Sequence, residues 1–358
     1  MEVALAEARK GLGRTSPNPC VGAVIVNNGR IVGRGYHKKA GTPHAEIHAL
    51  ADAGTDAHGA TMYVTLEPCN HTGRTPPCSR AVCEAGIRRV VVGLMDPNPL
   101  ASGGAGYLQK QGVEVVTGVC EKACRSLNYP FIKHVTTGLP WVVMKAALSL
   151  DGKITYQTGR GGAISGTKSK EFVHRLRNNI DAILIGIDTA VIDDPSLTTR
   201  LPGQESRDPL RIIIDSSLRT DPGSKVLTQQ SSAETWIFYS TDIVTDSQKI
   251  ALKRSGAQLH KVPATTDGQV DIKEVLHILG EKNILSLLVE GGASIFGSFL
   301  RNNLVDEVFL LLAPFFIGEQ GQPLLTGYSA ETPDQVTRLR EVTTSRQGDD
   351  TLIHGLLS

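Results

Sequence analysis

The stretch that decides the fold of the first half reads Thr42-Pro-His44-Ala-Glu46 and then Thr65-Leu-Glu67-Pro-Cys69-Asn-His-Thr-Gly-Arg-Thr-Pro-Pro-Cys78. A catalytic zinc site takes three nitrogen or sulfur ligands and leaves one position for water. His44, Cys69 and Cys78 are therefore the predicted ligands. Glu46 stands too close to His44 to be an independent ligand, and we expect it to move protons to and from the activated water.

Zinc deaminases carry His-x-Glu followed by Pro-Cys-x-x-Cys, with the glutamate as acid and base. The His-Ala-Glu segment fits this pattern, but eight residues separate Cys69 from Cys78 instead of two. Taken singly, a histidine before a helix is usually a cap, and two intracellular cysteines are usually small apolar residues. The combination favours zinc. Pro43 and Pro77 are expected in the first turns of two helices, where the helix dipole stabilises thiolate.

Composition is that of a soluble enzyme. The chain has 358 residues, 40% hydrophobic and 20% charged, which is too long for one ordinary core and predicts two domains. We place their boundary at the helix-breaking segment 138–140, which gives domains 1–138 and 139–358.

Charge and hydropathy indicate which partners to expect. The net charge is +1 and no dense Lys/Arg run occurs, so we expect no nucleic-acid partner, because such binding needs many phosphate contacts. The longest apolar run, 308–317, contains a proline and is far too short to cross a membrane. The first residues do not resemble a signal peptide and the six cysteines follow no secreted pattern. We expect a cytoplasmic protein.

Periodicity and turn residues predict the elements of the first half in order. They are a helix at 2–10, a hairpin with a strand at 21–26 and a turn at 27–30, a helix at 43–53, a strand at 61–66, a helix at 77–86, a strand at 90–94, a helix at 104–111, a strand at 113–117 and a helix at 121–135. A hairpin followed by this alternation implies an α/β sheet with helices on both faces. Cys120 and Cys124 lie on the last helix, where we expect plain packing.

Several loop segments resemble the deaminase half of the bifunctional riboflavin-biosynthesis deaminase–reductases. They are Thr15-Ser-Pro-Asn18-Pro, Gly35-Tyr-His37, the zinc motif with its eight-residue gap, and Asp96-Pro-Asn-Pro. The resemblance implies a cytidine-deaminase-like three-layer sandwich that deaminates a phosphoribosyl diaminopyrimidinone, a small-molecule substrate. It also implies that four residues contact this substrate: Asn18, His37, His71 and Arg74. One departure is Ala105, which stands where the family usually has a basic residue between two glycines.

The second half alternates again. The predicted elements are a strand starting at 141, a helix at 167–178, strands at 182–186, 211–215 and 235–239, helices at 246–255 and 271–280, a strand at 285–289, a helix at 293–302, a strand at 305–312 and an antiparallel pair near 338–342 and 351–357. Gly291 and Gly292 join a strand to a helix, where free backbone N–H groups suit an anion. Two glycines alone more often form a tight turn.

Three spaced motifs extend the resemblance to the reductase half of the same family, whose fold is a mixed sheet similar to dihydrofolate reductase. They begin at Lys145, Asp193 and Val289. The resemblance implies that Lys145 lies near the reacting ribose and that Lys145 or Asp193 relays a proton. The implied NADPH contacts are Ala147, Ala163, Thr189, Asp193, Ser216, Gly292, Ala293, Ser294, Ile295, Phe296, Gly297 and Ser298. The implied substrate contacts are Gly161, Arg177, Leu197, Arg200 and Glu290.

The reductase half departs from the family at one place. Gly161 and Ala163 stand where relatives commonly have Ser-x-Trp, so a hydroxyl and a planar wall are missing, and a lost aromatic contact costs about 1 kcal/mol. We expect a homo-oligomeric two-step enzyme that uses Zn²⁺ and NADPH. Two alternatives stay open: a deaminase whose second domain only scaffolds, and a nucleic-acid-binding module with a deaminase-like fold.

Overall fold

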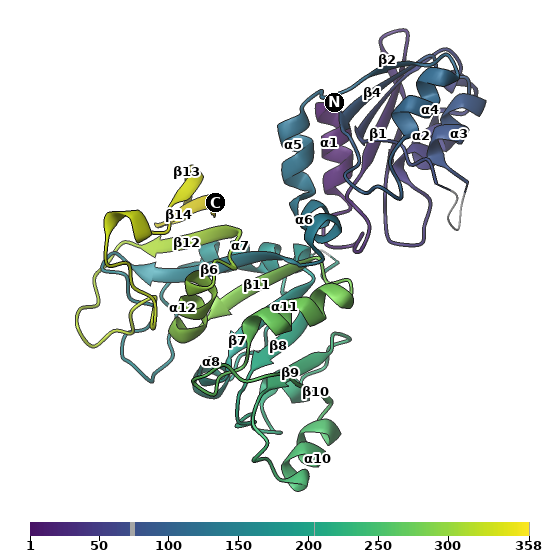
Figure 1. Cartoon of the computed structure of the whole chain (residues 1–358). Coiled ribbons are helices and arrows are strands. Elements are labelled where there is room, and N and C mark those ends of the chain that lie inside the picture. Colours follow the sequence, from purple (N-terminus) through teal and green to yellow (C-terminus); the bar gives the residue numbers. More distant parts are fainter. Residues whose placement is uncertain (72–75, 204, 358) are drawn as a thin grey trace. The chain divides into compact units, whose positions relative to one another are not determined.

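The computed structural model describes residues 1–71, 76–203 and 205–357 of the chain. It divides the chain into two compact units, Met1–Gly138 and Leu139–Ser358. Each unit is an α/β sheet with its own core, as the sequence predicts (Figure 1).

The first unit contains a five-stranded sheet with the order β2-β1-β3-β4-β5. Only β1 runs antiparallel to its neighbours, because the predicted hairpin joins it to β2. The elements are α1 (Glu2–Arg9), β1 (Gly22–Asn27), β2 (Arg30–Tyr36), α2 (Ala45–Ala53), η1 (Gly54–Ala57), β3 (Thr61–Leu66), α3 (Cys78–Glu84), β4 (Arg89–Leu94), α4 (Gly104–Lys110), β5 (Glu114–Val116), α5 (Glu121–Leu127) and α6 (Tyr129–Thr137).

Two glycines show that helices cover both faces of this sheet. A Cβ on Gly22 would lie 2.1 Å from the carbonyl oxygen of Ala4 in α1, and a Cβ on Gly35 would lie 2.3 Å from that of Ala45 in α2. Gly35 pairs with Ala23, the neighbour of Gly22, so the two glycines point to opposite faces. Helices α1 and α2 therefore pack closely on opposite sides, which gives the three-layer sandwich (Figure 1).

The expected helix at 121–135 is wrong, because α5 and α6 are separate helices. They meet at Asn128, whose side chain accepts a hydrogen bond from the Cys20 backbone N–H at 2.8 Å and donates one to the Cys20 carbonyl oxygen at 3.0 Å. The break thus satisfies the backbone of a segment distant in sequence, which helical periodicity does not reveal. Cys124 is fully buried in the core, whereas Cys120 is exposed.

The second unit contains a nine-stranded sheet with the order β10-β9-β8-β7-β11-β6-β12-β14-β13. All its strands are parallel except for β14, which is antiparallel to β12 and β13. The elements are β6 (Trp141–Ser149), α7 (Thr167–Asn179), β7 (Ala182–Gly186), α8 (Ile187–Asp193), β8 (Leu210–Ile214), α9 (Lys225–Thr228), β9 (Thr235–Tyr239), α10 (Asp246–Arg254), β10 (Ala257–Lys261), α11 (Ile272–Glu281), β11 (Ser286–Gly291), α12 (Ala293–Arg301), β12 (Glu307–Ala313), η2 (Pro333–Gln335), β13 (Leu339–Gln347) and β14 (Asp350–Leu357). Helices α8 and α9 and strand β10 were not predicted from the sequence.

The parallel strands bury apolar side chains on both faces, as sheets covered by helices on both sides do. Val142 and Phe238 pack toward α11 and α12, while Val143 and Ile237 pack on the opposite face. The strand ends that carry the glycine turn and the polar loops are therefore held on a rigid frame. Among the described residues, no helix is long and apolar enough to cross a membrane.

Candidate functional site

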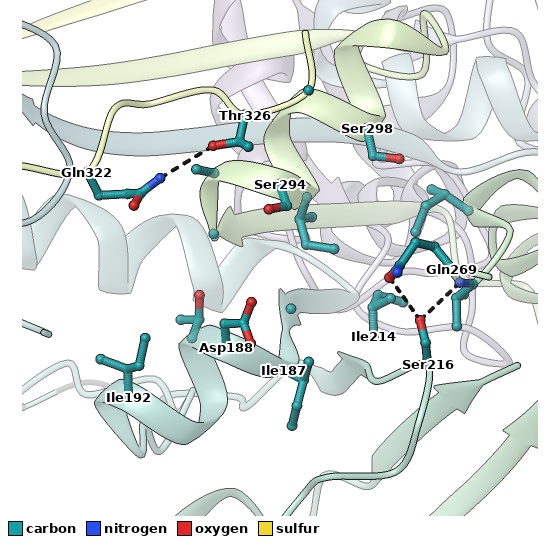
Figure 2. A pocket seen from close by; sticks show the side chains of 18 of the residues that line it. Ile187, Asp188, Ile192, Ile214, Ser216, Gln269, Ser294, Ser298, Gln322 and Thr326 are labelled. Carbon is teal, nitrogen blue, oxygen red and sulfur yellow. Dashed lines mark hydrogen bonds between the residues drawn. The ribbon is translucent and has the colours of Figure 1, made fainter. Parts of the chain in front are cut away.

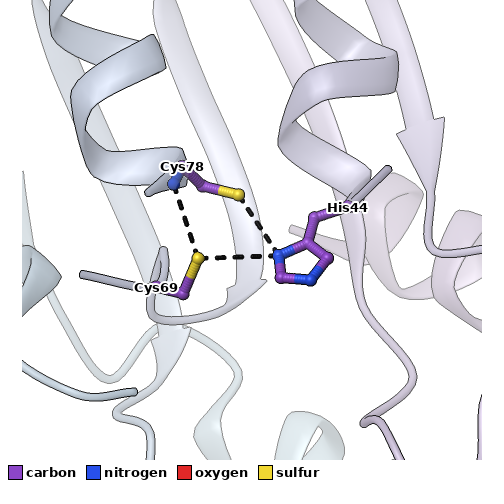
Figure 3. Close-up of side chains that lie close together, drawn as sticks. All are labelled: His44, Cys69 and Cys78. Carbon is purple, nitrogen blue, oxygen red and sulfur yellow. Dashed lines mark hydrogen bonds between the residues drawn. The ribbon is translucent and has the colours of Figure 1, made fainter. Parts of the chain in front are cut away.

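The three predicted zinc ligands meet at one point of the first unit (Figure 3). His44 is the N-cap residue of α2, Cys69 follows β3, and Cys78 is the first residue of α3. The imidazole of His44 makes no capping hydrogen bond, so it is free to face the cysteines. Pro43 and Pro77 lie just before these helices rather than in their first turns, which corrects the expected position.

The distances between the ligand atoms fit a tetrahedral metal. The Nδ1 atom of His44 lies 3.6 Å from the Cys69 sulfur and 3.3 Å from the Cys78 sulfur. Typical Zn–N and Zn–S bonds in a tetrahedron separate nitrogen from sulfur by about 3.6 Å. Within the described residues, this is the one group of three His, Cys, Asp or Glu side chains that could hold a metal. The donor set of one nitrogen and two sulfurs suits Zn²⁺.

The two thiols differ in acidity. A hydrogen bond from the Cys78 side chain lowers the pKa of Cys69 to about 4, and the backbone N–H of Cys78 also donates to the Cys69 sulfur at 3.4 Å. The hydrogen bond with Cys69, together with burial, raises the pKa of Cys78. Cys69 is therefore the more acidic of the two thiols.

Glu46 lies in the first turn of α2 and is 3% exposed. Burial raises the pKa of its carboxyl group to about 7, partly offset by the charge of His44. A carboxyl group with this pKa takes up and releases a proton at neutral pH, as a general acid and base must.

His37 and Asn18 form a hydrogen-bonded pair beside the metal ligands. His37 Nδ1 lies 3.2 Å from the Pro43 carbonyl oxygen, and His37 Nε2 lies 3.0 Å from Asn18 Nδ2. A carbonyl oxygen only accepts, so Nδ1 carries the proton, and burial lowers the pKa of this histidine. Neutral His37 therefore accepts from the Asn18 amide, which leaves Asn18 Oδ1 as an acceptor. The His37 ring also meets the His44 ring edge to face at 5.3 Å.

Fewer contacts are described for the two other predicted substrate residues of this unit. His71 is exposed at the end of the segment that carries Cys69. Arg74 lies outside the described residues.

Sequence reasoning missed Glu67, which is 3% exposed. Its carboxylate accepts three hydrogen bonds from backbone N–H groups, those of Asp96 at 3.2 Å, Gly103 at 3.1 Å and Ala105 at 2.9 Å. It thus ties the loop before α4 to the segment that carries Cys69. The sequence feature that could have indicated Glu67 is a charged residue placed directly between a buried strand and Pro68.

The second unit contains two adjoining cavities at the carboxyl ends of its parallel strands. The larger has a volume of about 840 Å³, and the smaller has about 360 Å³. Five residues line both cavities: Ile154, Thr155, Thr189, Asp193 and Gly292. Groups bound in the two cavities would therefore meet at these five residues.

The larger cavity, some of whose lining side chains are drawn in Figure 2, has features of a dinucleotide site. The N-cap residues of α8 and α12, Gly186 and Gly292, both line it, and such helix N-termini suit a pyrophosphate. Farther along the wall, Ser216 donates a hydrogen bond to the Gln269 side chain at 3.2 Å. The predicted cofactor residues that line this cavity are Thr189, Asp193, Ser216, Gly292, Ala293, Ser294, Ile295 and Ser298.

The remaining predicted cofactor residues lie elsewhere. Ala147, Ala163 and Phe296 line the smaller cavity. Gly297 belongs to neither lining. A Cβ there would lie 1.9 Å from the carbonyl oxygen of Thr326. Its physical role is close packing of α12 against the segment that precedes Gly327.

The smaller cavity contains a buried charge cluster. Arg177 donates to Glu290 through two hydrogen bonds, Nε to Oε1 at 2.8 Å and Nη2 to Oε2 at 2.7 Å, and Lys145 Nζ lies 4.0 Å from Glu290. The two cations outweigh burial and lower the pKa of Glu290 to about 2, while burial lowers the pKa of Lys145. Arg200 and two residues that the sequence did not single out, Lys170 and His174, complete the polar wall.

Gly161 and Leu197 belong to neither cavity lining. A Cβ on Gly161 would lie 1.9 Å from Asp193 Oδ1, so the carboxylate fills the space that a side chain at 161 would need. Burial raises the pKa of Asp193.

Comparisons with known proteins agree for both units. The family "RibD C-terminal domain" matches residues 140–353, and the family "Cytidine and deoxycytidylate deaminase zinc-binding region" matches residues 1–94. The chain is 43% identical to the riboflavin biosynthesis protein RibD of Aquifex aeolicus, covering 89% of this chain and 87% of that protein. It is 41% identical to RibD of Actinobacillus pleuropneumoniae, covering 99% and 93%.

Solved structures match over the full length. The RibD structure from Acinetobacter baumannii has a TM-score of 0.88 at 32% identity and covers 100% of this chain and 97% of its own. A diaminohydroxyphosphoribosylaminopyrimidine deaminase/5-amino-6-(5-phosphoribosylamino)uracil reductase from Thermotoga maritima has a TM-score of 0.87 at 34% identity, with the same coverage.

Proposed function

Because the chain belongs to the RibD family of bifunctional riboflavin-biosynthesis deaminase–reductases, we propose which of its own residues carry each reaction. The enzyme is a zinc-dependent pyrimidine deaminase and an NADPH-dependent reductase. We assign deamination of the phosphoribosyl diaminopyrimidinone to residues 1–138, and reduction of the ribosyl group to a ribityl chain to residues 139–358. The observation that carries the first assignment is the buried Glu46 carboxyl group beside the three metal ligands.

In the deamination, bound zinc acts as a Lewis acid that makes water a nucleophile near neutral pH. His44, Cys69 and Cys78 would hold it. Glu46 accepts a proton from the attacking water and delivers it to the departing ammonia, a task that its pKa of about 7 supports.

Asn18 and His37 position the pyrimidine. The tautomer of His37 orients the Asn18 amide, so that Asn18 Oδ1 accepts a hydrogen bond from a ring or amino N–H of the substrate. We assign His71 and Arg74 to the ring or the phosphate, because arginine presents a forked donor set to phosphate oxygens.

In the reduction, bound NADPH supplies the hydride. The larger cavity would hold it through the predicted residues that line this wall, and the smaller cavity would hold the ribosyl group. The two cavities meet at five shared residues, which include Thr189, Asp193 and Gly292. The anomeric carbon receives the hydride and its bond to the ring oxygen breaks, so a proton must reach that oxygen.

Lys145 and Asp193 are the candidate donors of this proton. Lys145 lines the smaller cavity, where burial lowers the pKa of its ammonium group and makes proton release easier. Asp193 lies at the junction of the two cavities, and burial makes its carboxyl group hold a proton more readily. Arg177 and Glu290 neutralise each other, which leaves Arg200 as the assigned contact for the phosphoribosyl group. Gly161 and Leu197 remain predicted contacts.

We also propose that the enzyme is a cytoplasmic homo-oligomer. Strand β13 lies at the end of the nine-stranded sheet, and residues 340–346 of this strand are all exposed. A long edge strand of this kind offers a surface for pairing with a second chain.

The test is an assay with the diamino substrate that records ammonia release and NADPH absorbance separately. Wild-type enzyme is expected to produce both signals. Glu46→Gln is expected to keep zinc, measured by metal analysis, and to lose ammonia release, while NADPH oxidation with deaminated substrate continues. Near-normal ammonia release by this variant would refute the role of Glu46. Ammonia release by the wild type without NADPH oxidation would mean that the second unit only scaffolds.

A further inference from the structure

Helix α7 (Thr167–Asn179) carries one edge of the smaller cavity. Lys170, His174 and Arg177 all line that cavity, and their spacing places them on one face of the helix. The position of α7 therefore decides where three polar side chains stand relative to a bound ribosyl group.

The two ends of α7 are held by two buried carboxylates from other parts of the sheet. Near its C-terminal end, Arg177 is fixed by Glu290 of β11 and donates to the Thr198 carbonyl oxygen at 3.1 Å. At its N-terminal end, the N-cap residue Gly166 has no side chain with which to cap the helix.

Asp350 supplies the missing cap from the far end of the chain. The backbone N–H of Gly166 donates to Asp350 Oδ2 at 2.8 Å, and Ser169 Oγ donates to the same oxygen at 2.5 Å. Asp350 is the first residue of β14, is 3% exposed, and lies 184 positions after Gly166. A carboxylate there satisfies one orphan backbone N–H group and the buried Ser169 hydroxyl group, and it complements the positive end of the helix dipole.

The loop that enters α7 also lines the smaller cavity, through Gly162, Ala163, Ile164 and Ser165. Asp350 itself belongs to neither cavity lining. We propose that Asp350 is a positioning residue of the reductase site, which fixes the start of α7 and its entry loop so that the cavity is formed before substrate binds. This inference rests on the proposed function of the second unit.

The test compares Asp350→Ala and Asp350→Asn with Asp349→Ala, a matched control at the exposed neighbouring position in the same turn. Loss of a helix cap shifts an ordering equilibrium by about fivefold. Asp350→Ala is expected to raise the KM for the deaminated ribosyl substrate by about this factor, with little change in kcat or in the KM for NADPH. Its ammonia release from the diamino substrate is expected to stay at the wild-type rate.

Two further results decide the proposal. Asp350→Asn keeps an oxygen acceptor and is expected to restore most of the lost affinity, and hydrogen exchange over residues 163–170 is expected to be faster in Asp350→Ala than in Asp349→Ala. An unchanged substrate KM, or equal changes in kcat and in both KM values, would overturn it. If Asp350→Ala does not fold, the same KM comparison is made with Ser169→Ala, which removes one of the two hydrogen bonds to Asp350 and is expected to raise the substrate KM in the same direction. A wild type that never oxidises NADPH would refute the proposed function instead. The hydrogen-exchange measurement alone would then decide whether Asp350 fixes the start of α7.

Discussion

Replacing Glu290 by glutamine removes the charge from a carboxylate that is buried between two cations. The exposed fraction is 8% for the Glu290 side chain and 13% for each of Arg177 and Lys145. The variant would leave a guanidinium and an ammonium facing each other without an anion. Breaking a buried ion pair costs about 3–5 kcal/mol. Because Lys145 can relieve the repulsion by losing its proton, we expect a loss of about 3 kcal/mol in the free energy of unfolding at pH 7.

Urea unfolding followed by tryptophan fluorescence measures this loss in the right unit, because both tryptophans of the chain, Trp141 and Trp236, lie in the second unit. Asp188→Asn is the matched control. Asp188 pairs with Arg219 at 2.7 Å, the same distance as the closest Arg177–Glu290 contact, but the two side chains are 71% and 54% exposed. Exposed pairs contribute about 1 kcal/mol or less. Equal losses in the two variants would refute the argument from burial.

The pH dependence gives an independent check. Burial lowers the pKa of Lys145 while Glu290 opposes the shift, so the pKa falls further in Glu290→Gln. When the folded pKa of a lysine is below its unfolded value, the unfolded state binds more protons and stability rises with pH, up to about 10.4. We expect the deficit of the variant to shrink as the pH rises from neutral toward the unfolded pKa of lysine. In the wild type, the depressed pKa of Glu290 contributes stability above about pH 4.3 that is lost as the pH falls toward about 2.

Three further predictions concern other parts of the chain. Gly161→Ser would place its Cβ about 1.9 Å from Asp193 Oδ1, so the Asp193 carboxyl group must rotate away, and because Asp193 is a candidate proton donor we expect NADPH oxidation to fall by up to about tenfold; unchanged turnover would show that Asp193 rotates without loss of activity. Glu67→Gln replaces one accepting oxygen by an NH₂ group that faces a backbone N–H donor. We expect the free energy of unfolding of the first unit to fall by about 1–3 kcal/mol and zinc to be lost faster to a chelator; zinc retention equal to the wild type would contradict this. Burial lowers the pKa of His260, so the stability that its neutral form contributes is present above about pH 6.5 and is lost as the pH falls. His260→Phe is expected to make the free energy of unfolding, followed by fluorescence, depend less on pH below about 6.5; an unchanged pH dependence would mean that another group titrates there.

The amino-acid sequence predicted the fold class and the family because those signals are local. Alternation of apolar strands with amphipathic helices indicated the α/β units. The segment from His44 to Cys78 indicated zinc, since its residue types have few other uses in that combination. The predicted bounds of a helix were wrong where a contact with a residue distant in sequence decides where the helix ends. Asn128 breaks a helix because its side chain satisfies the backbone of Cys20.

Chemistry that resides in a short segment was thus determined by the sequence alone: the metal ligands, Glu46 beside them, and the glycine turn before α12. The tertiary structure alone decided which carboxylates support them. Glu290 and Arg177 are 113 positions apart, Asp350 and Gly166 are 184 apart, and the Glu67 carboxylate reaches backbone N–H groups 29 to 38 positions away. Such contacts depend on the order and register of strands, which many sequence-distant segments determine together, and local propensity does not encode them.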